Sequence, residues 1–231
     1  MISSIIRLMK LRKVESTDDV VNYVSRTIAE KLESGKRVFW LVTGGTAIGA
    51  EVAVSEKLRG VPLGNLMVTL TDERYGPVGH ANSNWQQLLN AGFSLPGARL
   101  EPVLIDRNDE ETTRNFDTVV REGLEDYDYA IGFFGIGADG HTSGILPGSI
   151  GLTSPELVVD YSAPDYGHRI TTTARAITSL DEAVASVMGE DKIPALKNLV
   201  KDLSPAEQPA QIFKRVKQAI IFNDFTRRFS E

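Results

Sequence analysis

The feature that most constrains the fold is an apolar run that ends abruptly in glycines. Residues 128–134 form a mostly apolar stretch of strand length, and Gly135-Ile136-Gly137-Ala138-Asp139-Gly140-His141 follows directly. A continuous apolar run bounded by turn residues is typical of a strand buried on both faces. Glycines allow a ligand to approach the backbone closely. Because open α/β sheets bind ligands at the carboxyl ends of their strands, Asp139 and His141 become candidate functional residues.

Taken alone, this segment leaves two interpretations open. Glycines after a strand commonly form a tight turn with no further role. A single histidine is also more often a hydrogen-bonded structural residue than a catalyst. The remaining segments of the chain decide between these interpretations.

Similar strands recur along the chain and alternate with amphipathic helices. Strands are predicted at 37–42, 65–70, 100–105, 128–134, 156–161, 168–173 and 218–222. Helices are predicted at 16–35, 47–58, 110–124, 193–200 and 209–217, with another opening at 85–89 and a solvated tail at 226–229. The stretch 179–188 fits either a helix or a helix followed by a strand. This alternation predicts a Rossmann-like α/β fold, with a mostly parallel sheet flanked by helices on both faces. We expect one domain spanning residues 1–231.

Composition excludes several functional classes. The formal net charge of −6 argues against a general nucleic-acid binder, so an anionic ligand requires a local cluster of positive groups. The chain has no cysteine, which excludes disulfides and thiolate metal sites. Residues 1–10 are too short and too charged for a signal sequence, and no apolar run reaches membrane-spanning length. We therefore expect a cytoplasmic protein without a membrane partner.

Thr43-Gly44-Gly45-Thr46 follows the predicted strand at 37–42 and precedes a predicted helix. Free amides at a helix N-terminus and the positive end of the helix dipole favour an anion at such a turn, and phosphate is the expected guest. The spacing matches neither the nucleotide P-loop nor the dinucleotide fingerprint. A purely structural turn remains the alternative.

Charged residues occur at two further positions where strands or loops end. Asp72-Glu73-Arg74 follows the strand at 65–70, so a carboxylate and a guanidinium could face the same pocket. A solvated, salt-bridged turn is the alternative. Lys192 opens the helix at 193–200, where a cation opposes the helix dipole, and a nearby anion would explain its presence.

Taken in order, these segments resemble the family that contains 6-phosphogluconolactonase and glucosamine-6-phosphate deaminase. The matching segments are 43–46, 72–74, 83–84, 135–142, 146–149, 169–171 and 189–192. They span almost the whole chain, and their shared order makes chance a poor explanation. The resemblance implies the fold of the glucosamine-6-phosphate isomerase/deaminase superfamily.

Within this family the details resemble the lactonases. Lactonases share Asp-Glu-Arg, Ser-Asn and a Thr after Asp-Gly-His, whereas deaminases carry a Glu where this chain has Leu146. Two positions depart from the family pattern. Ala47 stands where Pro is usual, which retains the amides and loses some rigidity. Ser143-Gly144-Ile145 replaces the usual Ala-Ser-Leu, which predicts a looser pocket wall.

The resemblance implies hydrolysis of 6-phospho-D-glucono-1,5-lactone, a step of the oxidative pentose phosphate pathway. A lactone carbonyl is already electrophilic, so we expect neither a cofactor nor a metal. His141 is expected to activate water, because an imidazole is neutral yet basic near neutral pH. Asp139 or Asp72 would orient its ring. Arg74 would stabilise the oxyanion or bind sugar hydroxyls.

The resemblance also implies a phosphate site. Gly44, Gly45 and Thr46 are expected to bind the phosphate, with Arg169 and Lys192 supplying positive charge. A deaminase or isomerase of the same fold and a non-catalytic sugar-phosphate sensor remain alternatives. Ammonia release from glucosamine 6-phosphate would indicate the first, and binding without turnover the second. Oligomeric state is not predicted.

Overall fold

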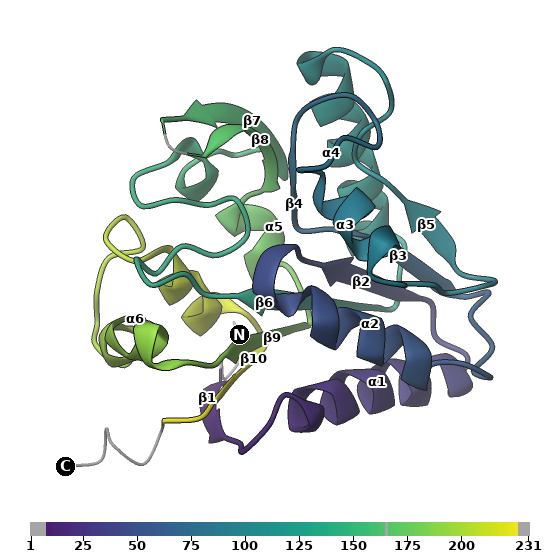
Figure 1. The fold of residues 1–231 in the computed structure, drawn as a ribbon, viewed down its shortest axis with the longest axis horizontal. Helices are drawn as coiled ribbons and strands as arrows, with labels where there is room; N and C mark the ends of the chain where they lie inside the picture. The colour runs from purple at the N-terminus through teal and green to yellow at the C-terminus, as the bar shows by residue number, and fades with distance from the viewer. Residues whose placement is uncertain (1–7, 165, 226–231) are drawn as a thin grey trace, which may run out of the picture.

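A computed structural model describes residues 8–164 and 166–225, so the predicted tail at 226–229 lies outside the described residues. Seven strands form one sheet in the order β1-β10-β9-β6-β2-β3-β5 (Figure 1). They are β1 (Leu8–Lys13), β2 (Val38–Val42), β3 (Leu66–Leu70), β5 (Arg99–Glu101), β6 (Tyr129–Gly135), β9 (Glu182–Val187) and β10 (Gln218–Asn223). All neighbouring pairs run parallel. The predicted mostly parallel α/β architecture is confirmed.

Helices cover both faces of this sheet (Figure 1). They are α1 (Asp18–Glu33), α2 (Ile48–Lys57), α3 (Asn84–Asn90), α4 (Asp109–Glu125), α5 (Ala174–Thr178) and α6 (Ile193–Leu199). Short 3-10 segments are η1 (Gly45–Ala47), η2 (Ile150–Leu152), η3 (Glu190–Lys192) and η4 (Pro209–Arg215). Trp40 of β2 belongs to the apolar core with α1 and α2, whereas the adjacent Phe39 and Leu41 belong to the core with α5, α6 and η4. Alternation along one strand thus places its side chains in both cores.

Three segments differ from the sequence-based predictions. The ambiguous stretch 179–188 contains strand β9, which lies between β6 and β10, so packing inside the sheet overrides its helix-favouring alanines. The last helix, predicted at 209–217, is the 3-10 segment η4 rather than an α-helix. The strand predicted at 100–105 is shorter and is β5, which ends at Glu101. The sequence did not predict β1, because its alternating basic residues lie at the sheet edge.

No helix in the described part of the chain is long and apolar enough to cross a membrane.

A second, smaller sheet is antiparallel and has the order β4-β8-β7. It consists of β4 (Asp72–Arg74), β7 (Val158–Ala163) and β8 (Gly167–Thr172). Its register places Asp72 opposite Thr171 and Arg74 opposite Arg169. In Figure 1 its strands lie above the main sheet. The small sheet therefore brings two distant charged segments of the chain side by side.

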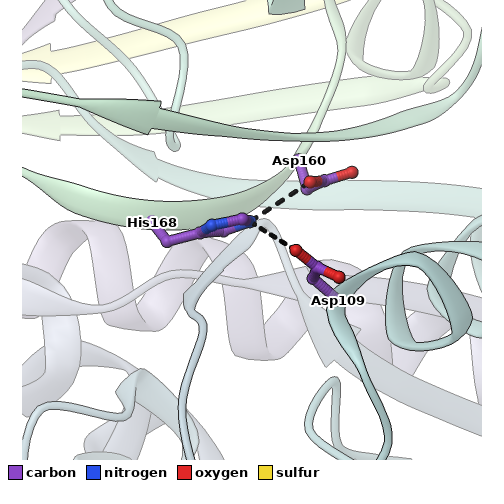
Figure 2. A group of neighbouring side chains, drawn as sticks. All are labelled: Asp109, Asp160 and His168. Atoms are coloured by element: carbon purple, nitrogen blue, oxygen red, sulfur yellow. Dashed lines mark hydrogen bonds and ion pairs between the residues drawn. The ribbon is translucent and has the colours of Figure 1, made fainter.

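His168 joins this small sheet to helix α4. Its Nε2 lies 3.1 Å from Oδ2 of Asp160 on β7 and 3.9 Å from Oδ2 of Asp109 at the start of α4 (Figure 2). The ring also packs against Tyr75, with a centroid separation of 5.2 Å. These contacts help to hold β7 and β8 against α4.

Candidate active site

A cavity of about 330 Å³ is lined by residues that follow the carboxyl ends of β2, β3, β6 and β9. Strands β2 and β6 are neighbours, but β3 extends the sheet on one side and β9 on the other, so the strand order reverses between them. Ligands of open α/β sheets bind at such a point. The lining includes all the predicted site residues except Asp139: Gly44, Gly45, Thr46, Asp72, Arg74, His141, Arg169 and Lys192.

His141 is oriented by Asp139. Oδ1 of Asp139 lies 2.6 Å from Nδ1 of His141 and also accepts the His141 backbone N–H at 3.1 Å. Burial would raise the pKa of Asp139, but the hydrogen bonds and charge of His141 together hold that pKa below its ordinary value. An ionised Asp139 favours a proton on Nδ1, which leaves Nε2 able to accept one. The pair therefore has the arrangement of an oriented general base.

Gly137 permits this close packing. A Cβ at position 137 would lie 2.2 Å from Cε1 of His141 and 2.6 Å from Oδ1 of Asp139. Such distances are far inside van der Waals contact, so any side chain here would displace the pair. The glycine after β6 thus has a steric role beside the histidine.

Asp72 is paired with Arg169 rather than with the His141 ring. Arg169 donates from Nη1 to Oδ2 of Asp72 at 3.0 Å, and both side chains are nearly buried. Burial raises the pKa of Asp72, although the charges of Arg169, Arg74 and His141 oppose that rise. Among the described residues, the buried Nε of Arg169 has no hydrogen-bond partner. A buried, unsatisfied cationic N–H favours an anionic ligand.

Only two of the three charged residues of β4 line the cavity. Arg74 donates from Nη1 to Oδ1 of Asn84 at 2.9 Å, and Asn84 donates from Nδ2 to the Asp72 carbonyl at 2.9 Å. Glu73 instead accepts from the Asn84 backbone N–H at 2.7 Å and from Ser83 Oγ at 2.8 Å. Glu73 therefore stabilises the start of α3, while Asp72 and Arg74 border the cavity.

The predicted anion loop forms one wall of the cavity. It passes through η1 into α2, and no side chain caps either segment. The N–H groups of Gly44, Gly45 and Thr46 therefore remain available to an anion. Lys192, in η3 just before α6, borders the same cavity and pairs with the exposed Asp191 at 3.1 Å. An exposed pair of this kind is weak, so it would not prevent Lys192 from binding an anion in the cavity.

Residues 12–222 match the family described as glucosamine-6-phosphate isomerases/6-phosphogluconolactonase. The chain belongs to this family. The 6-phosphogluconolactonase of Thermotoga maritima is 27% identical over 192 residues, which cover 80% of this chain and 84% of the relative. The 6-phosphogluconolactonase of Caulobacter vibrioides is 28% identical over 225 residues, which cover 90% of this chain and 93% of the relative.

Solved structures share the fold of this isomerase/lactonase family. The crystal structure of the Thermotoga maritima 6-phosphogluconolactonase has a TM-score of 0.80 at 23% identity, covering 94% of this chain and 99% of that one. The structure of a monomeric glucosamine-6-phosphate deaminase also has a TM-score of 0.80, at 17% identity, covering 96% of this chain and 100% of that one. Because a lactonase and a deaminase fit equally well, fold alone does not separate the two activities.

Several residues at this family site were not predicted from the sequence as site residues. Tyr166 packs edge-on against the His141 ring at 6.0 Å and lies 5.2 Å from the Arg169 guanidinium carbon. Asn84 and Ser143 line the cavity. The pair Ser83-Asn84 was noted only as a family match, and the hairpin around Tyr166 carries no pattern that indicates a site.

The remaining residue missed by the sequence analysis is Glu51 of α2. Its side chain is fully buried, and its Oε1 accepts the Thr43 backbone N–H at 2.5 Å. Oε2 has no partner in the described part of the chain. Burial raises the pKa of Glu51 well above 4.5, and the nearby Asp72 charge adds to the rise against the opposing Thr43 bond. Glu51 therefore supports the anion loop from behind, and its burial favours the protonated form of the carboxyl.

Replacing Glu51 with glutamine is expected to flatten the dependence of stability on pH. The folded protein keeps Glu51 protonated at pH values where the unfolded chain, with a glutamate pKa of about 4.5, loses the proton. Stability is therefore lost as pH rises above about 4.5 towards the folded-state pKa. Glutamine keeps an acceptor for Thr43 and removes this titration. Urea denaturation from pH 4 to about 8 measures the difference, and parallel profiles would contradict the prediction.

Replacing Gly44 with alanine is expected to destabilise the fold by about 1–3 kcal/mol. A Cβ at this position would lie 2.1 Å from Oδ1 of Asn84, the atom that accepts from Arg74. Gly49 of α2 provides the control, because a Cβ there meets nothing within 4 Å. Gly49→Ala should be neutral or stabilising, since alanine favours a helix. Thermal unfolding of both variants measures this contrast, and equal effects would contradict it.

Proposed function

We propose that this chain hydrolyses 6-phospho-D-glucono-1,5-lactone to 6-phosphogluconate. The observation that carries the proposal is that His141, which is paired with Asp139, borders the same cavity as Arg169, whose buried Nε has no partner among the described residues. A base and an unsatisfied cation in one cavity suit a substrate that is both hydrolysable and anionic. The relatives named 6-phosphogluconolactonase support this substrate.

The proposed chemistry begins with a water molecule held by Nε2 of His141. As the water oxygen bonds to C1 of the lactone, a water proton moves to Nε2. The electron pair of the C=O bond moves onto the carbonyl oxygen. Asp139 stabilises the imidazolium through Nδ1. Arg74 stabilises the oxyanion or binds the sugar hydroxyls. When the intermediate collapses, the C1–O5 bond breaks and O5 takes the proton from Nε2.

The phosphate end of the proposed complex lies on the anion loop. The amides of Gly44, Gly45 and Thr46 would bind phosphate oxygens, because no side chain caps the start of η1 or α2. Arg169 and Lys192 would add charge-assisted hydrogen bonds. The net charge of −6 supports a small-molecule partner rather than nucleic acid, and a cytoplasmic location is part of the same proposal.

The test is lactone hydrolysis measured as an initial rate above spontaneous ring opening. We expect turnover of the phosphorylated lactone with a kcat/KM about 100-fold above that of unphosphorylated glucono-1,5-lactone. This ratio corresponds to charge-assisted contacts to the phosphate. A rate equal to the uncatalysed background would overturn the proposal.

A parallel assay separates the deaminase alternative. Glucosamine 6-phosphate carries the same phosphate, so it tests the reaction rather than the anion site. Leu146 occupies the position where the deaminases carry a glutamate, and its backbone N–H donates to the Tyr161 hydroxyl at 3.4 Å. We expect no ammonia release from this compound. Ammonia release without lactone hydrolysis would assign the chain to the deaminases instead.

A further inference from the structure

A tight turn directly after His141 carries Ser143. The Ile145 N–H donates to the Thr142 carbonyl at 2.9 Å and closes the turn. Thr142 Oγ1 donates to the Gly135 carbonyl at 2.9 Å, and the Gly144 N–H donates to Thr171 Oγ1 at 3.1 Å. These bonds tie the turn to β6 and β8 and fix the position of Ser143 beside the histidine.

The backbone of Ser143 is in a conformation that glycine adopts more readily. Its φ is +51°, and among the described residues only Asp106 shares a positive φ without being glycine. Turns with positive φ at the first central position favour glycine or asparagine there. Gly144 serves a different purpose, because a Cβ on it would lie 2.8 Å from Cβ of Thr171. The turn therefore bears a strained serine where glycine would be relaxed.

The hydroxyl of Ser143 is also unsatisfied. Its Oγ is enclosed and has no hydrogen-bond partner within residues 8–164 and 166–225. The residue nevertheless lines the cavity together with His141. A serine hydroxyl reorients by rotation about one bond, so an atom of a bound ligand can supply the missing partner. Strain and an unmade hydrogen bond at one residue indicate a function for its side chain.

We propose that the Ser143 hydroxyl binds the sugar end of the substrate, through a hydroxyl adjacent to the lactone carbonyl. This inference rests on the proposed lactone hydrolysis. Ser143 lies two residues after His141 in a turn tied to β6 and β8, so it borders the reacting end of the cavity. The phosphate loop belongs to a different segment, the one that follows β2. Ser143 is thus a substrate-binding residue that this chain has in place of an alanine typical of the family.

Ser143→Gly separates binding from folding. We expect KM for the phosphorylated lactone to rise about 3–10-fold, the equivalent of one hydrogen bond, with kcat changed less than two-fold. Inhibition by inorganic phosphate, which probes the other end of the cavity, should keep its KI. The thermal midpoint should equal or exceed that of the wild type, because glycine relieves the positive φ. Ser143→Ala should show the same rise in KM as Ser143→Gly, without the gain in stability.

Ser149→Ala is the matched control. Its Oγ is likewise buried without a partner in the described part of the chain, but the residue does not line the cavity. We expect its KM to match that of the wild type. An active wild type with an unchanged KM in Ser143→Gly would overturn the inference and leave the proposed function intact. So would a changed phosphate KI, or parallel losses of stability and activity. A wild type without lactone hydrolysis would overturn both proposals.

Discussion

His141→Ala is expected to lower kcat for lactone hydrolysis by about 10²–10⁴-fold, the usual contribution of a general base. KM should change little, because the proposed phosphate contacts come from other loops. The physical reason is the loss of the imidazole that the Asp139 carboxylate orients at 2.6 Å. Initial rates, corrected for spontaneous hydrolysis and compared at saturating substrate, measure the effect.

His168→Ala is the control for this variant. His168 is also half-buried and paired with an aspartate, but it does not line the cavity (Figure 2). Its removal should leave kcat at the wild-type value. The base assignment would be wrong if His141→Ala kept wild-type turnover, or if both histidine variants lost activity equally.

The second large effect is expected for Arg169→Ala. Asp72 would remain buried without its 3.0 Å partner, and an uncompensated buried charge costs about 3–5 kcal/mol of folding stability. Loss of the proposed contact to phosphate should also raise KM about 10–100-fold, with a smaller change in kcat. Denaturant titration and steady-state kinetics measure the two effects separately.

Arg121→Ala is the matched arginine control. Arg121 pairs with Asp117 on the surface of α4 at 2.9 Å, where solvent screens the interaction. We expect a loss of less than about 1 kcal/mol and an unchanged KM. An Arg169→Ala variant that keeps the wild-type KM would contradict a role in phosphate binding, whatever its stability.

The sequence was sufficient to predict the parallel α/β fold and the loops that border the cavity. Buried strands are recognisable because apolar runs such as 37–42 and 128–134 end directly in glycines. Parallel strands bring their carboxyl ends to one edge, so loops distant in sequence become neighbours. His141, Arg74 and the anion loop were therefore identifiable before their contacts were known.

Side-chain pairing was decided by the tertiary structure, because it depends on which elements lie next to each other. Antiparallel pairing of β4 with β8 brings Asp72 beside Arg169, and the two form an ion pair. The His141 ring is hydrogen-bonded to Asp139 instead. The same applies to the buried carboxyl of Glu51 and to the strain at Ser143. Local patterns encode burial and turns, whereas partners brought together from opposite parts of the chain are specified only by the packed fold.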